Sequence, residues 1–244
     1  MSNCAVVIPV YKAEFDAEEY FAVSHSVKHL EGYDIHWLVP QSLNMDYYFK
    51  NFNIQYVQRF DDAYFQNIEG YNRLLVSIEF YERFKEYEYT LISQPDAIII
   101  KPELHLWLEK KFDYIGAPWP SGYSLKVKTK SIPMAEEITC TAFIGNGGLS
   151  LRRNQACVDL LNEFEDLQKE WSKHGHAEDL FFSLIGSISV KYQLPNIIQA
   201  ALFSHDVEIR YVNKLIGGVK PFGIHAWNKY DRELSMELIN QSGD

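Results

Sequence analysis

Two apolar runs separated by a short break lie within residues 87–102, which read YEYTLISQPDAIIIKP. The first run, Tyr89–Ile92, has the composition of a β-strand, and the second run is Ala97–Ile100. Pro95 has no amide proton to donate to a sheet ladder, so it marks the end of the first strand. Asp96 therefore follows the carboxyl end of a strand, where open α/β sheets bind ligands. An Asp at this position is also explained by its preference for turns.

The composition is that of a globular protein. The chain has 244 residues, which is long enough for one large domain with a sizeable core. Aromatic residues make up 15% of the sequence, more than a disordered chain would carry. The net charge of −10 argues against a nucleic-acid partner bound through a broad basic face.

The cysteine pattern and the hydropathy bear on where the protein works. The three cysteines show no CxxC spacing, and a reduced cytosolic compartment is the simplest account of them. We expect neither a signal peptide nor a spanning helix, because no sufficiently long apolar window is present. A peripheral association with a membrane surface leaves little trace in a sequence and stays open.

Strands alternating with helices organise the first hundred residues, which predicts an α/β fold with a mostly parallel sheet flanked by helices. Cys4–Val10 is apolar almost throughout, as expected for a strand buried on both faces. Helical spacing of apolar residues runs over Ile68–Phe84. The other expected elements are a helix over residues 16–31 and strands at 35–39 and 53–58.

The second half of the chain is less regular. Residues 120–137 contain Gly122, Pro133 and three lysines (Lys126, Lys128 and Lys130) without a clear period. A segment of this length is either a lid or binding loop, or a solvated surface excursion. The remaining expected elements are helices at 102–111, 154–171 (with Asn154 as a possible cap) and 180–187, strands at 113–116, 138–144 and 207–212, and a polar tail from residue 231.

The segment Gly145-Asn146-Gly147-Gly148 is rich in glycine directly after an expected strand. Glycine lets a backbone approach a ligand closely, although a bulge or a tight corner would also explain it. No Gly-Lys-Ser or Gly-Lys-Thr follows, which argues against a P-loop.

Three groups of titratable residues follow the glycines. Glu178 and Asp179 are either helix-dipole partners in a first turn or candidates for a general base. His174 and His176 beside Glu178 form a weaker candidate for a metal cluster, because no further ligand completes it. His225 is either a core histidine or, if it meets Asp96, a ligand for a divalent cation completed by phosphate oxygens and water.

Together these segments resemble the GT-A class of nucleotide-sugar glycosyltransferases, and more closely a little-characterised family of putative glycosyltransferases in bacteria and fungi. The resemblance covers nearly the whole chain in the expected order. The matching segments are VVIPVY at residues 6–11, YNRLL at 71–75, QPD at 94–96, YIGAPW at 114–119, GNGGLSLR at 145–152, ED at 178–179 and GIHAW at 223–227.

The resemblance implies roles for individual residues. Pro9, Val10 and Tyr11 would contact the nucleoside, and Gly147 and Gly148 would pass close to the transferred sugar. Gln94-Pro95-Asp96 would stand at the Asp-X-Asp position, with Gln94 in place of the first acid and Asp96 binding Mn²⁺ or Mg²⁺. The other implied roles are His225 as the second metal ligand and Asp179 (favoured over Glu178) as the catalytic base. Arg73, Arg152 and the lysines of residues 126–130 are candidate cations near the diphosphate, with ordinary surface charge as the alternative.

The resemblance also implies an activity. We expect a single GT-A-like domain over residues 1–244, with a nucleotide-binding half (1–100), an acceptor and catalytic half (101–230) and a polar tail (231–244). It would be a hexosyltransferase moving a sugar from a UDP-sugar to a hydroxyl of a glycan or lipid-linked glycan, with inversion. The expected setting is polysaccharide or lipopolysaccharide synthesis in the cytoplasm or at the inner face of the cytoplasmic membrane.

Other functions stay open at this point. Gln94 in place of an acid is compatible with a metal-independent glycosyltransferase. The many aromatic residues are compatible with a non-catalytic carbohydrate-binding module on a GT-A-like scaffold. A nucleotidyltransferase would share this type of sheet, but no basic Gly-rich loop follows the first strand.

Overall fold

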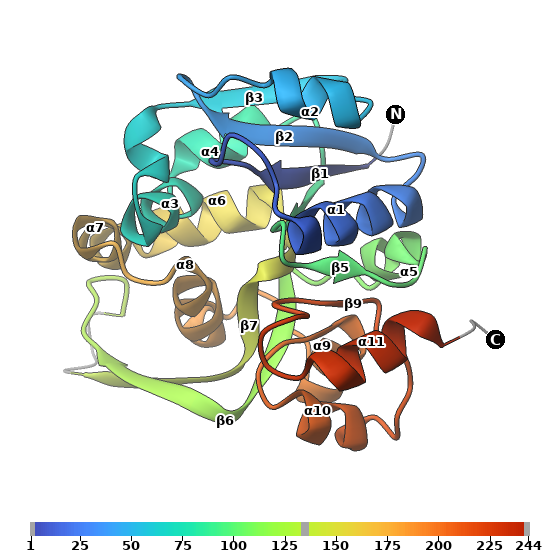
Figure 1. Cartoon of the computed structure of the whole chain (residues 1–244). Helices are drawn as coiled ribbons and strands as arrows, with labels where there is room; N and C mark the ends of the chain where they lie inside the picture. The colour runs from blue at the N-terminus through green and yellow to red at the C-terminus, as the bar shows by residue number, and fades with distance from the viewer. Residues whose placement is uncertain (1–2, 133–136, 242–244) are drawn as a thin grey trace.

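A six-stranded sheet forms the centre of the molecule, with strand order β3-β2-β1-β4-β7-β6 (Figure 1). The computed structural model describes residues 3–132 and 137–241. The first four strands of this order are parallel, and β7 and β6 are antiparallel to their neighbours. The expected α/β class is confirmed. The strands are β1 (Cys4–Pro9), β2 (Asp34–Pro40), β3 (Tyr56–Phe60), β4 (Tyr89–Ser93), β6 (Tyr114–Val127) and β7 (Ile138–Arg153).

Helices cover the sheet, and local sequence determines where several of them start. Asp16 and Glu19 form a capping box at the start of α1 (Ala17–His29). The expected helix over Ile68–Phe84 is instead two helices, because the Ser77 hydroxyl accepts from Phe80 N and begins a new one. The helices of the first half are α2 (Asp46–Asn51), η1 (Asp62–Phe65), α3 (Ile68–Leu75), α4 (Ile78–Arg83) and α5 (Leu104–Glu109).

The helix expected over residues 154–171 is also divided, at Phe164, into α6 (Asn154–Glu163) and α7 (Glu165–His174). Asn154 is the first helical residue and not a side-chain cap. Its amide donates to the backbone carbonyls of Phe84 and Tyr87, which ties α6 to the segment that precedes β4. The expected cap is therefore a tertiary contact.

Strands β6 and β7 continue beyond the sheet as a two-stranded arm (Figure 1). Residues 120–127, expected to be irregular, belong to β6, and β7 runs without a break through the glycine segment to pair with β4. The change of register around Gly122, which has a φ of +70°, lets the arm turn away from the core. Residues 133–136, including Pro133, lie outside the described residues.

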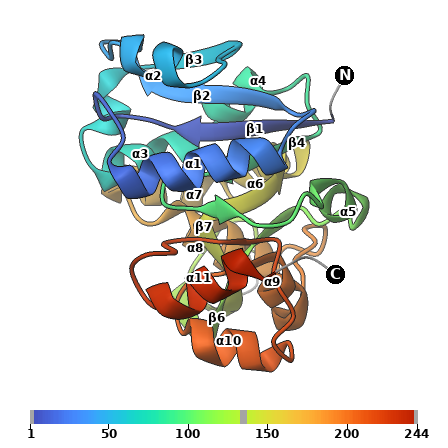
Figure 2. The same ribbon diagram turned by 45° about the vertical axis from the view of Figure 1, so that its right-hand side comes forward.

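A small second sheet with order β5-β9-β8 lies beside the first, together with the C-terminal helices (Figures 1 and 2). The strand expected at 207–212 is wrong, because Ile209 and Val212 lie three residues apart on the buried face of helix α10. The elements of this part are β5 (Ile98–Ile99), α9 (Ile197–Phe203), β8 (Ser204–His205), α10 (Ile209–Leu215), β9 (Gly223–Ile224) and α11 (Arg232–Asn240). The elements α8 (Glu178–Leu180), a π-helix (Phe181–Ile185) and η3 (Gly186–Ile188) pack against β7.

The expected polar tail is corrected by helix α11. Leu234, Leu238 and Ile239 are buried on one face of this helix and pack in an apolar cluster with Ile98 and Trp227. Residues 242–244 of the expected tail lie outside the described residues. Among the helices that the structure describes, none is long and apolar enough to cross a membrane.

Candidate functional site

The candidate residues lie near the carboxyl ends of β1 and β4, the edge at which open α/β sheets bind ligands. Pro9 ends β1 and is buried, and Val10 is 1% exposed in the core. Tyr11 is 57% exposed. Of the three residues expected to contact a nucleoside, only Tyr11 therefore offers a free side chain.

The turn after β4 brings Gln94 and Asp96 to the same histidine. Ala97 N donates to the Gln94 carbonyl at 2.8 Å, which closes a tight turn around Pro95. The Nε2 atom of His225 lies 3.3 Å from Gln94 Oε1 and 3.3 Å from Asp96 Oδ1. Gln94 and His225, which are 131 positions apart in the chain, thus meet at one point, although nothing in the sequence spacing requires it.

His225 is held from both sides of its ring. Its Nδ1 lies 3.1 Å from Oδ1 of Asp206, a carboxylate that is 3% exposed. Burial lowers the pKa of His225, but the hydrogen bonds to Asp206 and Asp96 outweigh burial and raise this pKa to about 9. Burial likewise raises the pKa of Asp96, and the hydrogen bond and charge of His225 more than offset it, so that the net shift is downward.

These donor atoms are suited to a divalent cation. Neighbouring ligands of an octahedral ion with bonds of about 2.1 Å lie about 3 Å apart, close to the separations around Nε2. Imidazole nitrogen, carboxylate oxygen and amide oxygen are all ligands of Mn²⁺. Two of the three donors are Asp96 and His225, and the third is the amide oxygen of Gln94. Within residues 3–132 and 137–241, no group of three or more His, Cys, Asp or Glu side chains has the geometry to hold a metal ion.

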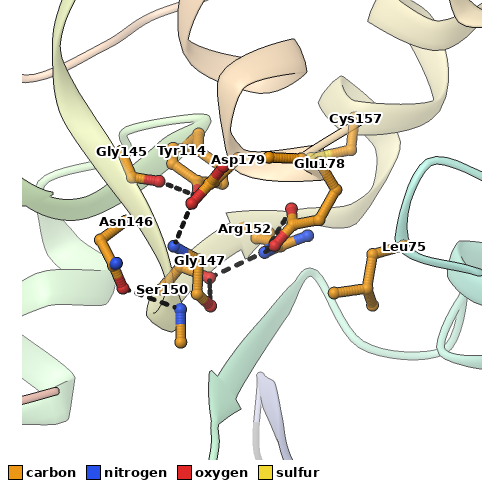
Figure 3. Close-up of polar contacts among 12 residues, drawn as sticks. Leu75, Tyr114, Gly145, Asn146, Gly147, Ser150, Arg152, Cys157, Glu178 and Asp179 are labelled. Atoms are coloured by element: carbon orange, nitrogen blue, oxygen red, sulfur yellow. Dashed lines mark hydrogen bonds and ion pairs between the residues drawn. The ribbon is translucent and has the colours of Figure 1, made fainter. Parts of the chain in front are cut away.

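Asp179 is partly buried beside the glycine segment (Figure 3). Its Oδ2 accepts from Gly147 N at 3.1 Å and its Oδ1 accepts from Leu180 N at 2.7 Å. Burial and the neighbouring charge of Glu178 raise the pKa of Asp179 to about 7. A carboxyl group with this pKa is suited to proton transfer near neutral pH.

Glu178 faces the other way, into the core (Figure 3). Its carboxylate forms a buried ion pair with Arg152, whose Nη2 lies 2.9 Å from Oε2. Arg152 is 0% exposed and lies over the rings of Tyr114 and Phe182. Arg152 is therefore neither a surface charge nor a cation facing a diphosphate, and the role of base for Glu178 is not supported by this geometry.

Gly147 and Gly148 make room for protein side chains. A Cβ on Gly147 would overlap the carboxylate of Glu178, and a Cβ on Gly148 would overlap the imidazole of His225. These close approaches explain both glycines without a sugar, so their implied contact with a transferred sugar stays a prediction.

The other candidate cations lie in different surroundings. Arg73 is on α3 and forms no ion pair within the described part of the chain. Lys126 pairs with Glu137 across the arm at 3.0 Å.

The weaker metal candidate, His174 and His176 with Glu178, is not assembled. His174 lies 3.6 Å from Glu170 and stacks on His176, and neither histidine contacts Glu178.

Asp206 is the main residue that the sequence reasoning missed. It binds His225 through Oδ1 and accepts from Asn146 Nδ2 at 2.8 Å through Oδ2. It directly precedes the strand expected at 207–212, and no local signal in the sequence distinguished Asp206 from the acids of the surface.

An apolar groove lies between strand β6 and helix α7, with a volume of about 550 Å³. Tyr123 and Leu125 line it from β6 and remain 50% and 40% exposed, although they project from the apolar side of the arm. Leu180 lines the groove as well and follows Asp179 directly on α8. The groove therefore borders the element that carries the candidate base.

Comparison with solved structures identifies the fold. Apo mouse xyloside xylosyltransferase 1 matches with a TM-score of 0.53 and 11% identity over 90% of this chain and 96% of its own. A glycosyltransferase involved in the glycosylation of the major capsid of PBCV-1 matches with a TM-score of 0.50 and 10% identity, covering 96% and 98% of the two chains. The apo bifunctional glycosyltransferase WbbM gives 0.54 and 11%, covering 99% of this chain and 50% of its own.

The fold is thus of the GT-A glycosyltransferase type, and at these identities the likeness concerns the fold alone. A search of the curated proteins finds no match. A family model described as a protein of unknown function (DUF5672) matches residues 54–225, so the chain belongs to this family. The matched region contains Asp96, Asp179 and His225 together.

Proposed function

We propose that this protein transfers a sugar from a nucleotide-sugar donor, a UDP-sugar, to a hydroxyl group of an acceptor. The observation that supports this proposal is the convergence of Asp96, Gln94 and His225 at the carboxyl ends of the parallel strands. Such a cluster beside a partly buried carboxyl group is suited to holding a diphosphate and activating a hydroxyl.

In this proposal Asp96, Gln94 and His225 hold Mn²⁺ or Mg²⁺. When bound, the cation would offset the negative charge that develops on the diphosphate as the sugar departs. Asp96 is 43% exposed at its side chain and can therefore meet a ligand from solvent. His225, at 13%, is fixed from behind by Asp206.

Asp179 is the general base of the proposed reaction. The acceptor oxygen forms a bond to the anomeric carbon, the bond from that carbon to the diphosphate breaks, and the hydroxyl proton passes to an Asp179 oxygen. Because only one carboxylate is then required, we propose an inverting displacement. A pKa of about 7 gives Asp179 a substantial ionised fraction at neutral pH.

The proposed acceptor is a glycan or lipid-linked glycan. The groove beside α8 supports this choice, because Tyr123 and Leu125 offer exposed apolar surface to a sugar ring or a lipid chain. We extend the proposal to cell-surface polysaccharide or lipopolysaccharide synthesis, in the cytoplasm or at the inner face of the cytoplasmic membrane.

The test is thermal unfolding of the purified protein with Mn²⁺ and millimolar UDP, GDP or CDP. A ligand at 100 times its Kd stabilises by about 2.7 kcal/mol, which corresponds to about 5–10 °C in Tm for a chain of this size. We expect this shift with UDP and its loss in Asp96→Asn. If none of the nucleoside diphosphates changes the Tm, the donor site is refuted.

A metal-independent transferase is the second candidate, and the charged contact between His225 and Asp96 favours it. A protonated imidazole beside an amide side chain could itself face a diphosphate. Donor hydrolysis measured in excess EDTA separates the two mechanisms. Turnover that survives EDTA would remove the metal role from Asp96 and His225, while glycan binding without any donor turnover would indicate a carbohydrate-binding module.

A further inference from the structure

Five residues around the candidate metal ligands form a closed ring of hydrogen bonds. His225 contacts Asp206 at 3.1 Å, and Asp206 accepts from Asn146 at 2.8 Å. Asn146 Oδ1 accepts from Gly148 N at 3.0 Å, and the Gly148 carbonyl accepts from Gln94 N at 2.8 Å. The 3.3 Å contact between Gln94 Oε1 and His225 Nε2 closes the ring.

The chemistry of the ring decides which atoms donate. A carboxylate only accepts, so the proton on this side belongs to His225 Nδ1, and Asn146 presents its amide nitrogen to Asp206. The amide oxygen of Asn146 then faces Gly148 N and accepts its hydrogen bond. The direction of each hydrogen bond in the Asp206 half of the ring is thus fixed.

Asp206 is unusual among the acids of this chain. It is 3% exposed, and burying a carboxylate is costly unless it is paired or hydrogen-bonded. Its two oxygens serve His225 and Asn146, and no Lys or Arg ion pair to Asp206 occurs within residues 3–132 and 137–241. The buried carboxylate of Asp206 is thus stabilised by hydrogen bonds from His225 and from Asn146 of the glycine segment.

We propose that Asp206 and Asn146 are positioning residues that turn the His225 ring so that Nε2 faces Asp96 and Gln94. This inference rests on the proposed function, because it assigns the support of the same site. Partners of this kind orient a metal-binding histidine and typically change metal affinity 10- to 100-fold when mutated. Asn146 adds a link that couples the ring orientation to the backbone of Gly148.

An exchange of the two side chains tests the ring. In Asp206→Asn the new amide turns its NH₂ group either toward the NH₂ of Asn146 or toward the Nδ1 proton of His225, and Asn146→Asp sets two carboxylates against each other. Neither single variant therefore keeps the ring together with the Nδ1 proton. The double variant Asn146→Asp/Asp206→Asn restores it, because Asn at 206 donates to Asp at 146 and still accepts from His225. Asp113→Asn is the control, since Asp113 is 0% exposed and belongs to a separate ion pair with Arg153.

Two readouts separate this inference from the proposed function. In metal-free protein, ¹⁵N–¹H NMR should detect the hydrogen-bonded His225 Nδ1 proton in the wild type, the control and the double variant, and lose it in both single variants. Mn²⁺ titration followed by EPR should show affinity lowered 10- to 100-fold in the single variants and recovered in the double.

The possible outcomes are distinct. An Nδ1 signal that persists in both single variants, or single variants that bind Mn²⁺ as tightly as the wild type, would overturn the positioning role. A wild type that shows the Nδ1 signal but binds neither Mn²⁺ nor UDP would leave the positioning of the ring intact and refute the proposed function. Loss of Mn²⁺ binding in Asp113→Asn to the same degree would trace the effect to general destabilisation and so count against the inference.

Discussion

Replacing Glu178 by Gln should destabilise the protein, because it removes the charge that Arg152 faces in the core. The Arg152 Nη2 atom lies 2.9 Å from Oε2 and 3.0 Å from Oε1 of Glu178, and neither side chain is more than 5% exposed. Gln has the length of Glu and keeps one acceptor oxygen. The change is therefore confined to the charge and to one of the two contacts.

Removing one partner of a buried ion pair costs about 3–5 kcal/mol, because the other charge is left unpaired. The rings of Tyr114 and Phe182 lie 5.2 and 5.4 Å from the guanidinium carbon of Arg152 and continue to stabilise the cation. We therefore expect a loss near the lower limit, about 3 kcal/mol. For a chain of this length the corresponding decrease in Tm is on the order of 10 °C.

Urea unfolding followed by far-UV circular dichroism measures this loss. Glu165→Gln is the matched control, since Glu165 pairs with Lys169 on the surface with both side chains about two-thirds exposed, and it should cost less than about 1 kcal/mol. The double variant Arg152→Met/Glu178→Gln should recover most of the stability. If Glu178→Gln unfolds like the wild type but abolishes turnover, the structural role argued for Glu178 is refuted and it becomes the candidate base.

Three further predictions follow from burial and close contacts. The folded-state pKa of Asp179 is raised to about 7, so turnover should rise as the pH increases through 7. Because the folded protein holds this proton more tightly than the unfolded chain does, the free energy of unfolding should fall by up to about 4 kcal/mol between about pH 4 and 7. This fall should occur in the wild type and not in Asp179→Asn. Gly148→Ala should displace His225 and weaken the UDP- and Mn²⁺-dependent rise in Tm. Leu238→Ala in α11 should cost about 2–5 kcal/mol in urea unfolding, whereas truncation within a solvated tail would cost nothing.

The strands that carry the fold could be predicted because their signal is local. Residues 4–10 are apolar and residues 89–92 are apolar except for Thr90, and the two segments form the central strands β1 and β4, which are buried on both faces. The prediction of a strand at residues 207–212 was wrong because its local pattern was misleading. These residues alternate in polarity like a strand, but the spacing of Ile209 and Val212 fits one face of a helix packed on the core, and tertiary burial decided between the two.

The candidate site was predictable only in part, because its contacts are not local. The 3.3 Å approach of Asp96 to His225 was expected from a family resemblance, and no spacing rule would join residues so far apart in the chain. The ion pair of Arg152 with Glu178 and the carboxylate of Asp206 left no signature in the sequence, since each depends on side chains that only the folded chain brings together.

The two adjacent glycines connect these contacts through the geometry of a strand. Successive residues of a strand point to opposite faces, and Gly147 leaves room for Glu178 while Gly148 leaves room for His225. At this point of β7 the Glu178 carboxylate and the candidate base Asp179 therefore approach the strand from one side, and His225 approaches it from the other. A side chain at either position would overlap one of these two groups, so each of the two successive glycines is required by a different neighbour.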